Sequence, residues 1–591
     1  MNKPLLAAVL AFVAASAPRA IAQNDVPSKV SIEFNRYHTH DEIEAALGRL
    51  AAAYPDICRV EVIGKSLQGR DMRVLVVSNS KNGPDTVKPA MWIDGAVHAN
   101  EIQAAEAVLY SAWYLTKHYG HTPAITKLVD ERAFYLLPMV NPDSRDAWFK
   151  GPSTPNNFRS NQRPIDNDRD GLTDEDGPDD LDGDGSITQM WKEDPSGRWE
   201  RDKTDPRIFR RVPSDKPPGG WTNLGEEGID NDGDGLINED GPGGDDMNRN
   251  WPAGWLPNYV QYGAGPYPLS HPETRAVADF IERRPNIAAA QSYHNAGGMI
   301  LRGPGAAFRE WAYPDQDVRV YDAMAKVGEK VLPYYKSMVI HKDLYTVHGG
   351  FVNWTAETLG IFSFTNEMWT PQKYYQRDGA SVGEPDQWLW RDRLAFGQLF
   401  TEYKEVTHPK HGKVLIGGMN KWSSRSTPTF LLEEECHRNF AFTMFHADQM
   451  PSIFVRRQAV KETSPGSFEL TLELANKGLI PTRSEHARRS AIGRPDLLRV
   501  EPASGTVLLA GELNSWDDES PRVIDHQPGR CLVPGGVPGK GAGGGGVLTR
   551  RFYIEGKPGT LVKVIYEADK ARGIEATIEL KAQDSTFSEP G

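Results

Sequence analysis

Apolar residues between positions 31 and 405 follow two alternating spacings. Residues 40–55 place Ile43, Leu47 and Leu50 on one stripe, which is typical of an amphipathic helix. The same reasoning predicts helices at 101–120, 273–284 and 320–332, and strands at 71–79, 89–99, 132–143, 287–294 and 360–368. Helices that alternate with strands predict an α/β fold in which a mixed central sheet is covered by helices.

The spacing of apolar residues changes beyond about residue 408. Residues 468–476 place Leu470, Leu472 and Leu474 on one face with a period of two, as in a strand with one buried side. Further strands of this kind are predicted at 560–568 and 575–582. The predicted organisation is therefore an N-terminal segment at 1–22, an α/β domain at 28–407 and a C-terminal β-sandwich domain at 415–591.

The N-terminal segment has the three parts of a secretory signal. Lys3 precedes an apolar run at 5–17, and residues 20–22 (Ala-Ile-Ala) have the pattern of a cleavage site. A buried N-terminal helix is the alternative interpretation. Since no other run reaches about 18 apolar residues, no membrane anchor is expected. We predict a secreted protein, either periplasmic or extracellular.

Charge is distributed unevenly along the 591-residue chain. The formal net charge is −13, but residues 166–184 alone hold ten acids and one Arg, and residues 230–246 hold seven acids. The remainder is slightly basic and has no basic stripe, so a nucleic-acid partner is not expected.

The three cysteines allow at most one disulfide. Cys436 and Cys531 are the candidate pair, with Cys58 left over. So small a number excludes a Cys-rich scaffold and a zinc site made of four cysteines.

The acidic windows contain three runs with acids at positions 1, 3 and 5 and Gly at position 6, which is the rhythm of calcium loops. The predicted calcium ligands are Asp166, Asp168, Asp170, Asp174, Asp180, Asp182, Asp184, Asp230, Asp232, Asp234 and Asn238. None of the runs has Glu at position 12, so they are not complete EF-hands; Asp176 and Asp240 are further candidates. The alternative is a solvated acidic loop without metal. We predict that Ca²⁺ folds the acidic insertion at 160–247.

His98 and Glu101 lie three positions apart where a predicted strand gives way to a helix. Ligands of open α/β sheets gather at such strand ends. His294 ends a later strand and is the candidate third ligand. Three protein ligands that leave a fourth position for water make an open catalytic zinc site. For each histidine alone, a structural role is the alternative.

Five motifs occur together, in the order "VHANE", "MNRNW", "QSYHN", "LYTVHGGFVNW" and "FSFTNEMW". In this order they resemble the zinc metallocarboxypeptidases of the carboxypeptidase A type, over about residues 31 to 405. The resemblance implies a secreted zinc enzyme whose substrates are peptides or proteins with a free C-terminal carboxylate. It implies hydrolysis of the C-terminal peptide bond by a zinc-activated water.

The resemblance also implies roles for individual residues. It assigns zinc to His98, Glu101 and His294, the general base to Glu367, the carboxylate clamp to Asn248 and Arg249, the cap over the bound terminus to Tyr345, and oxyanion stabilisation to Arg159, with Arg163 as second candidate. Val352 takes a pocket position where relatives that prefer basic termini carry an acid, so an apolar or aromatic terminal residue is favoured.

Two other functions remain open from the sequence. One is a zinc-dependent amide hydrolase of the same fold that acts on small N-acyl amino acids or peptidoglycan stem peptides. The other is a binding module without catalytic activity. The predicted metal ligands and Glu367 are all present, which favours an enzyme.

Overall fold

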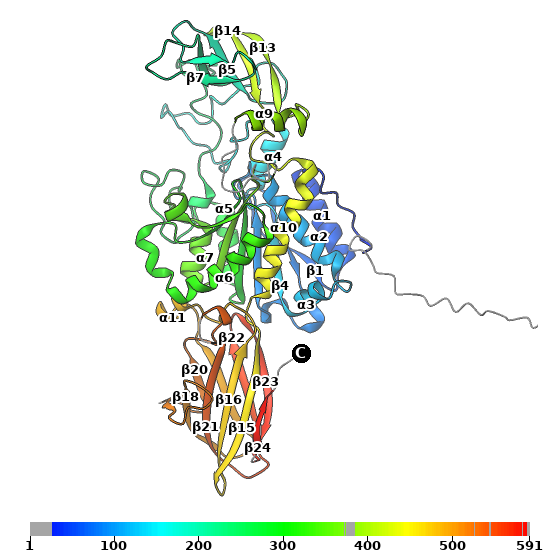
Figure 1. The fold of residues 1–591 in the computed structure, drawn as a ribbon, viewed down its shortest axis with the longest axis vertical. Coiled ribbons are helices and arrows are strands. Elements are labelled where there is room, and N and C mark those ends of the chain that lie inside the picture. Colours follow the sequence, from blue (N-terminus) through cyan, green and yellow to red (C-terminus); the bar gives the residue numbers. More distant parts are fainter. Residues whose placement is uncertain are drawn as a thin grey trace, which may run out of the picture.

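The computed structural model describes residues 26–370, 373, 384–524, 526–542, 545–581 and 583–587. The predicted signal segment at 1–22 lies outside these residues. Three parts follow one another along the long axis of the molecule (Figure 1). A small β lobe lies at one end, an α/β domain in the middle, and two further sheets at the other end.

The α/β domain is built on an eight-stranded sheet in the order β1-β2-β4-β3-β9-β12-β10-β11. Its strands are β1 (Cys58–Lys65), β2 (Asp71–Val77), β3 (Ala90–Gly95), β4 (Ala133–Leu137), β9 (Ile287–Asn295), β10 (Met299–Arg302), β11 (Lys336–Val339) and β12 (Phe362–Met368). The central strands β4, β3, β9 and β12 are parallel, whereas β1, β2 and β10 add antiparallel pairs. The predicted mixed sheet is confirmed.

Helices cover both faces of this sheet. They are α1 (His40–Ala53), α2 (Gln103–His118), α3 (Pro123–Glu131), α4 (Pro142–Lys150), α5 (Pro272–Glu282), α6 (Asp315–Val331), α7 (Phe351–Leu359) and α10 (Thr429–Asp448). In β3, Met91 and Ile93 belong to the core under α1, α2, α6 and α10, while Trp92 belongs to the core under α5 and α7. Alternate residues of a buried strand therefore serve two cores.

Helix α1 shows why the predicted elements form. Thr39 and Glu42 make a capping box, which satisfies free backbone N–H groups at the helix start. Ile43, Leu47 and Leu50 are buried, as the stripe predicted.

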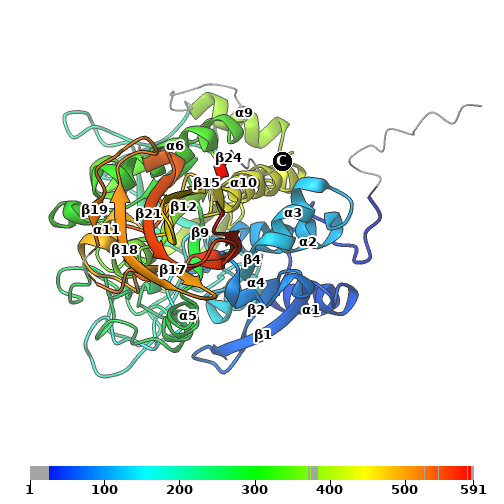
Figure 2. The same cartoon turned by 90° about the horizontal axis from the view of Figure 1, so that it is seen from below.

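Helix α10 belongs to the α/β domain, so this domain extends further along the chain than predicted. It packs beside α2 in the core of the α/β domain, and the C-terminal sheets begin only at Ile453 (Figure 2). The predicted boundary near residue 415 is therefore too early.

The β lobe, hereafter the insertion lobe, combines two distant segments. Its sheet has the order β13-β14-β5-β8-β6-β7. The strands are β5 (Gln189–Glu193), β6 (Trp199–Arg201), β7 (Phe209–Arg211), β8 (Trp221–Glu226), β13 (Phe400–His408) and β14 (Gly412–Met419). Helix α9 (Glu384–Arg393) precedes β13. The insertion at 160–247 thus shares a sheet with residues that the sequence assigned to the flanking domains.

Two antiparallel sheets form the C-terminal part, as predicted. Their orders are β19-β18-β21-β16-β15-β24 and β20-β17-β22-β23. The strands are β15 (Ile453–Ser464), β16 (Ser467–Asn476), β17 (Asp496–Pro502), β18 (Thr506–Leu513), β19 (Arg522–Val523), β20 (Arg530–Val533), β21 (Val547–Glu555), β22 (Leu561–Ala568), β23 (Ala571–Glu579) and β24 (Gln583–Phe587). Leu470 and Leu472 from one sheet share a core with Val500 and Val564 from the other.

The C-terminal part is docked on the α/β domain through the short helix α11 (Glu485–Arg489). The carboxylate of Asp317 in α6 accepts hydrogen bonds from the backbone N–H groups of Glu485 and His486, both at 2.8 Å. An acid at a helix N-terminus satisfies groups that have no partner inside the helix. Within the described residues, no helix has the length and apolar character needed to span a membrane.

All three cysteines are buried and free. Cys58 and Cys436 lie in the α/β core, whereas Cys531 lies in the core between the C-terminal sheets. The suggested Cys436–Cys531 disulfide is therefore wrong, because its two partners lie in different domains.

Candidate metal centre and substrate cavity

Strand ends bring the predicted catalytic residues together. The parallel strands β3, β9 and β12 are neighbours, so their carboxyl ends meet at one edge of the sheet. His98 and Glu101 follow β3, and His294 lies near the end of β9. Glu367 of β12 is in register with His294.

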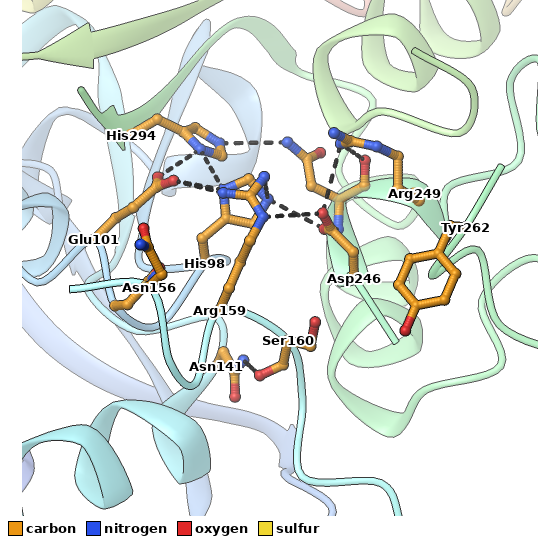
Figure 3. Close-up of polar contacts among 12 residues, drawn as sticks. His98, Glu101, Asn141, Asn156, Arg159, Ser160, Asp246, Arg249, Tyr262 and His294 are labelled. Carbon is orange, nitrogen blue, oxygen red and sulfur yellow. Dashed lines mark hydrogen bonds and ion pairs between the residues drawn. The ribbon is translucent and has the colours of Figure 1, made fainter. Parts of the chain in front are cut away.

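His98, Glu101 and His294 form a compact cluster (Figure 3). The Nδ1 atoms of the two histidines are 3.1 Å apart. Glu101 places Oε1 2.9 Å from Nδ1 of His98 and Oε2 2.9 Å from Nδ1 of His294. Tetrahedral zinc with bonds of about 2.0–2.1 Å needs donor atoms about 3.3 Å apart. The spacing and chemistry of these three donors therefore fit a zinc ion.

The carboxyl group of Glu101 is held in its ionised form. Burial opposes ionisation, but His98 and His294 outweigh it and hold the pKa of Glu101 well below its usual value. The backbone N–H of Asn295 also donates to Oε2 at 3.0 Å. A buried, ionised carboxylate beside two imidazoles is a ready metal ligand.

Asp246 contacts the ring nitrogen of His98 that faces away from Glu101, and the sequence analysis did not identify Asp246 as a site residue. Its Oδ1 lies 3.1 Å from Nε2 of His98, and its Oδ2 lies 3.4 Å from Nε of Arg159. Burial raises the pKa of Asp246, but His98, Arg249 and Arg159 hold it well below the usual value. The signal available in the sequence was an acid two positions before Asn248.

Arg159 lies at the metal cluster, whereas Arg163 does not. Arg159 donates from one terminal nitrogen to Oε1 of Glu101 at 3.0 Å. Although burial lowers its pKa, Asp246 and Glu101 raise it, so the guanidinium stays charged. Arg163 pairs instead with Asp245 at 2.5 Å.

A cavity of about 430 Å³ opens beside the cluster. It is lined by His98, Glu101, Arg159, Asn248, Arg249, Tyr345, Val352, Glu367 and Arg425, among others. Its apolar wall includes Met299, Leu301, Ile340, Leu344 and Phe351. The structure thus brings every sequence-predicted catalytic and substrate-binding residue to one cavity.

The clamp residues Asn248 and Arg249 lie in the 3₁₀ helix η4 (Met247–Arg249). Oδ1 of Asn248 accepts a hydrogen bond from the backbone N–H of Phe351 at 2.9 Å, which fixes the amide. The loop before α7 approaches closely because Gly349 has no side chain. Its φ is +64°, and a Cβ there would lie 2.2 Å from the Arg249 carbonyl oxygen.

Tyr345 and Val352 occupy different depths of the cavity. Tyr345 follows the single-turn π-helix η6 (Ile340–Leu344) and is 52% exposed, so it lies at the rim. Val352 lies in the first turn of α7 and is buried.

Glu367 is a buried carboxyl group with a raised pKa. Burial, followed by the repulsion from Glu101, raises its pKa to about 7. A carboxyl group with a pKa near neutrality can both accept and release a proton under physiological conditions.

The three acidic runs adopt the same local turn. The first acids, Asp166, Asp180 and Asp230, each accept hydrogen bonds from the backbone N–H groups three and five positions later. In the first run, Asp166, Asp168 and Asp170 gather closely enough to share an ion. Asp168 also gathers with Asp232 and Asp234, so the first and third runs lie together.

Other predicted calcium ligands make protein contacts. Two residues at position nine of their runs make hydrogen bonds to nearby segments of the protein: Asp174 accepts from the N–H of Ile165, and Asn238 donates to the Glu226 carbonyl. In the second run, Asp182 lies 3.7 Å from Nζ of Lys404, and Asp184 accepts from the N–H of Ser186. Asp176 and Asp240 pair through backbone hydrogen bonds between the first and third runs.

Comparison with known families agrees with this geometry. The profile described as "Zinc carboxypeptidase" (Peptidase_M14) matches residues 43–379, more than half of the chain. The chain belongs to the zinc carboxypeptidase family. A domain of unknown function, DUF8731, matches residues 452–579, which contain most of the C-terminal sheets.

Individual zinc carboxypeptidases resemble the chain only in part. Carboxypeptidase A2 from rat is 25% identical over 354 residues, which cover 57% of this chain and 64% of the rat protein. The chain therefore spans less than two thirds of the length of this relative. Human carboxypeptidase D is 31% identical over 134 residues, covering 23% of this chain and 10% of the human protein.

Solved structures are also similar to the chain. Thrombin-activatable fibrinolysis inhibitor matches with a TM-score of 0.42 and 19% identity, covering 70% of this chain and 74% of that chain. A metallo-carboxypeptidase from Burkholderia cenocepacia matches with a TM-score of 0.36 and 14% identity, covering 70% of each.

Proposed function

We propose that this protein is a secreted zinc-dependent carboxypeptidase that hydrolyses the C-terminal peptide bond of peptides and proteins. The observation that carries this proposal is that Arg249 lines the same cavity as His98 and Glu101, the two residues that cluster with His294. A set of three metal ligands alone fits many hydrolases. A guanidinium in the same cavity adds a site for a carboxylate, the group that distinguishes a chain end.

His98, Glu101 and His294 would hold the zinc ion through Nδ1, carboxylate oxygen and Nδ1. A zinc ion bound in this way polarises a carbonyl group and lowers the pKa of water towards neutrality. His98 and Glu101 line the cavity, so a water or a substrate carbonyl in the cavity would lie beside the ion.

The substrate would be oriented by its terminal carboxylate. Arg249 would bind that carboxylate, with Asn248 beside it, and Tyr345 at the rim would cover it. Val352 and the apolar wall would receive the terminal side chain, which favours apolar or aromatic residues.

The remaining charged groups would act on the scissile bond. Glu367 would take a proton from the attacking water and pass it to the departing amine, for which its raised pKa is suited. Arg159 would stabilise the negative charge that develops on the carbonyl oxygen.

Matched substrates test this proposal. An N-blocked dipeptide ending in Phe should be hydrolysed by the zinc-loaded protein, and its C-terminal amide should be at least about 100-fold slower, because Arg249 loses its ionic partner. Glu367→Gln should lower kcat by about 10² or more, while the exposed Glu434→Gln on α10 should leave it unchanged. Equal rates on acid and amide, or faster hydrolysis of an N-acyl amino acid, would favour the amide hydrolase instead.

Calcium binding by the acidic runs is part of the proposal. The support is their shared loop geometry and the closeness of the first and third runs. Added Ca²⁺ should raise the melting temperature of zinc-loaded, EDTA-treated protein; an unchanged value would remove calcium from the proposal.

The proposal that the protein is secreted is based on the signal-like pattern of residues 1–22. Expression of the full chain in a Gram-negative host should yield a mature protein that begins after Ala22, outside the cytoplasm. Retention of the segment in a cytoplasmic product would contradict it.

A further inference from the structure

Arg425 enters the catalytic cavity from outside the segment that matches the zinc carboxypeptidase family. That match ends at residue 379, and Arg425 lies between β14 and α10. Its side chain is 30% exposed and lines the same cavity as Glu101 and Glu367.

The contacts of Arg425 hold it beside the metal cluster but leave donors available. Its Nε donates to Oδ1 of Asn156 at 3.1 Å, and one terminal nitrogen donates to the carbonyl oxygen of Asn295 at 3.2 Å. The same nitrogen is 3.6 Å from Oε1 of Glu101, which is too long for a hydrogen bond. Within the described part of the chain, its other terminal nitrogen makes no hydrogen bond or ion pair.

The strap that carries Arg425, residues 420–428, is anchored on the α/β domain. Thr427 donates from its hydroxyl to Oε1 of Gln103 at 2.5 Å and accepts from the Tyr37 hydroxyl at its carbonyl at 2.6 Å. Trp422 packs edge-on against Trp148 with ring centroids 5.0 Å apart. The guanidinium is therefore held in place before any substrate arrives, which lowers the entropic cost of binding.

Arg425 lies on the Glu101 side of the cluster, since one terminal nitrogen is 3.6 Å from Oε1 of Glu101. Arg249 lies on the other side, beyond Asp246 as seen from Glu101 (Figure 3). A substrate whose terminal carboxylate is bound by Arg249 would cross the metal cluster towards Arg425. The residue that precedes the scissile bond would then face Arg425.

We propose that Arg425 is a specificity-determining residue that binds the side chain before the scissile bond and favours an acidic one. This inference rests on the proposed carboxypeptidase function, because Arg249 sets the direction of the substrate. A guanidinium with free donors binds a carboxylate more strongly than an amide, and it repels an ammonium group. Glutamate should therefore be preferred over glutamine, and glutamine over lysine, at the penultimate position.

Three N-blocked dipeptides that end in Phe and carry Glu, Gln or Lys before it test the inference on the zinc-loaded full chain. The wild type should show kcat/KM about tenfold or more higher for Glu than for Gln, mostly through KM. Arg425→Gln should bring the Glu:Gln ratio to near one, and Arg425→Lys should keep part of it. Arg438→Gln, at a partly exposed arginine on α10 paired with Glu434, is the control and should keep the full ratio.

The outcomes separate the inference from the proposed function. If no peptide with a free terminus is cleaved, the proposed function fails. If the peptides are cleaved and Arg425→Gln keeps the wild-type Glu:Gln ratio, only the inference fails. An equal loss on all three substrates together with lower zinc content would assign Arg425 to the support of Glu101 and would also overturn the inference.

Discussion

Replacing Asp246 with Asn tests how strongly the second layer of the site supports zinc binding. The substitution keeps the side-chain shape, and the amide oxygen can still accept the 2.8 Å bond from the backbone N–H of Asn248. It removes the negative charge 3.1 Å from Nε2 of His98. Loss of a carboxylate behind a metal-ligating histidine lowers metal affinity by about 10–100-fold, or about 1.4–2.7 kcal/mol.

Two further contacts define the direction of the effect on catalysis. Asp246 also holds Arg159 at 3.4 Å and lies 3.9 Å from Arg249. Without this charge both guanidinium groups lose a common anchor, so KM should rise as well as zinc affinity fall. A loss in kcat/KM should therefore remain at saturating zinc, when every site is occupied.

The assay is competition for zinc between the protein and a calibrated chelator, followed by kinetics on the blocked dipeptide. The neighbouring Asp245→Asn is a matched control, because Asp245 is also buried but pairs with Arg163 and His271. A zinc affinity for Asp246→Asn within twofold of the wild type, with an unchanged circular dichroism spectrum, would refute the reasoning.

Two other predictions concern specificity and stability. Val352→Asp should move the preference for the terminal residue from Phe towards Arg and Lys by about tenfold or more, because it places a charge in an otherwise apolar wall; unchanged preference in a panel of blocked dipeptides would place the terminal side chain elsewhere. In the C-terminal domain, burial raises the pKa of Asp496 to about 6. Because the folded state binds this proton more tightly, stability should fall by up to about 3 kcal/mol as pH rises from 4 to 6.5. Asp496→Asn should remove this loss, since both Thr482 and Tyr566 donate to a single oxygen that the amide retains. The free energy of unfolding can be measured with urea at pH 4.5 and 7.5. An equal change between the two pH values in the wild type and in Asp496→Asn would contradict the prediction.

The elements around the site could be predicted because their residues follow simple periods. Helix α1 buries one stripe, and β3 and β9 are fully buried strands that end close to His98 and His294. The parallel order of the strands then brings these ends together. The ends of these strands indicated His98, Glu101 and His294, whereas Glu367, Asn248 and Arg249 were assigned only through the resemblance to a known family.

Helix α10 escaped prediction because polar residues lie in its buried face. Asn439 is fully buried and accepts a hydrogen bond from Asn366 of β12 at 2.9 Å, while Glu435 is buried against Lys373 at 2.7 Å. Such hydrogen-bond partners offset the energetic cost of burying polar groups. They come from distant segments, so the local pattern of apolar residues does not reveal them.

The insertion lobe and Arg425 depend on contacts between distant segments. Leu415 of β14 pairs with Trp191 of β5 across more than 200 positions, and β5, with five residues, is too short to give a clear period. Arg425 reaches the cavity only because the strap after β14 returns to α2. Nothing in the local sequence indicates that return.

X-ray absorption on the purified protein, combined with metal analysis, tests the central claim most directly. The account predicts one zinc ion per chain, two imidazole nitrogens at about 2.0–2.1 Å, oxygen donors from one carboxylate and solvent, and loss of the ion in His294→Ala. A zinc-free active protein, or a zinc ion enclosed by a fourth protein side chain, would contradict it.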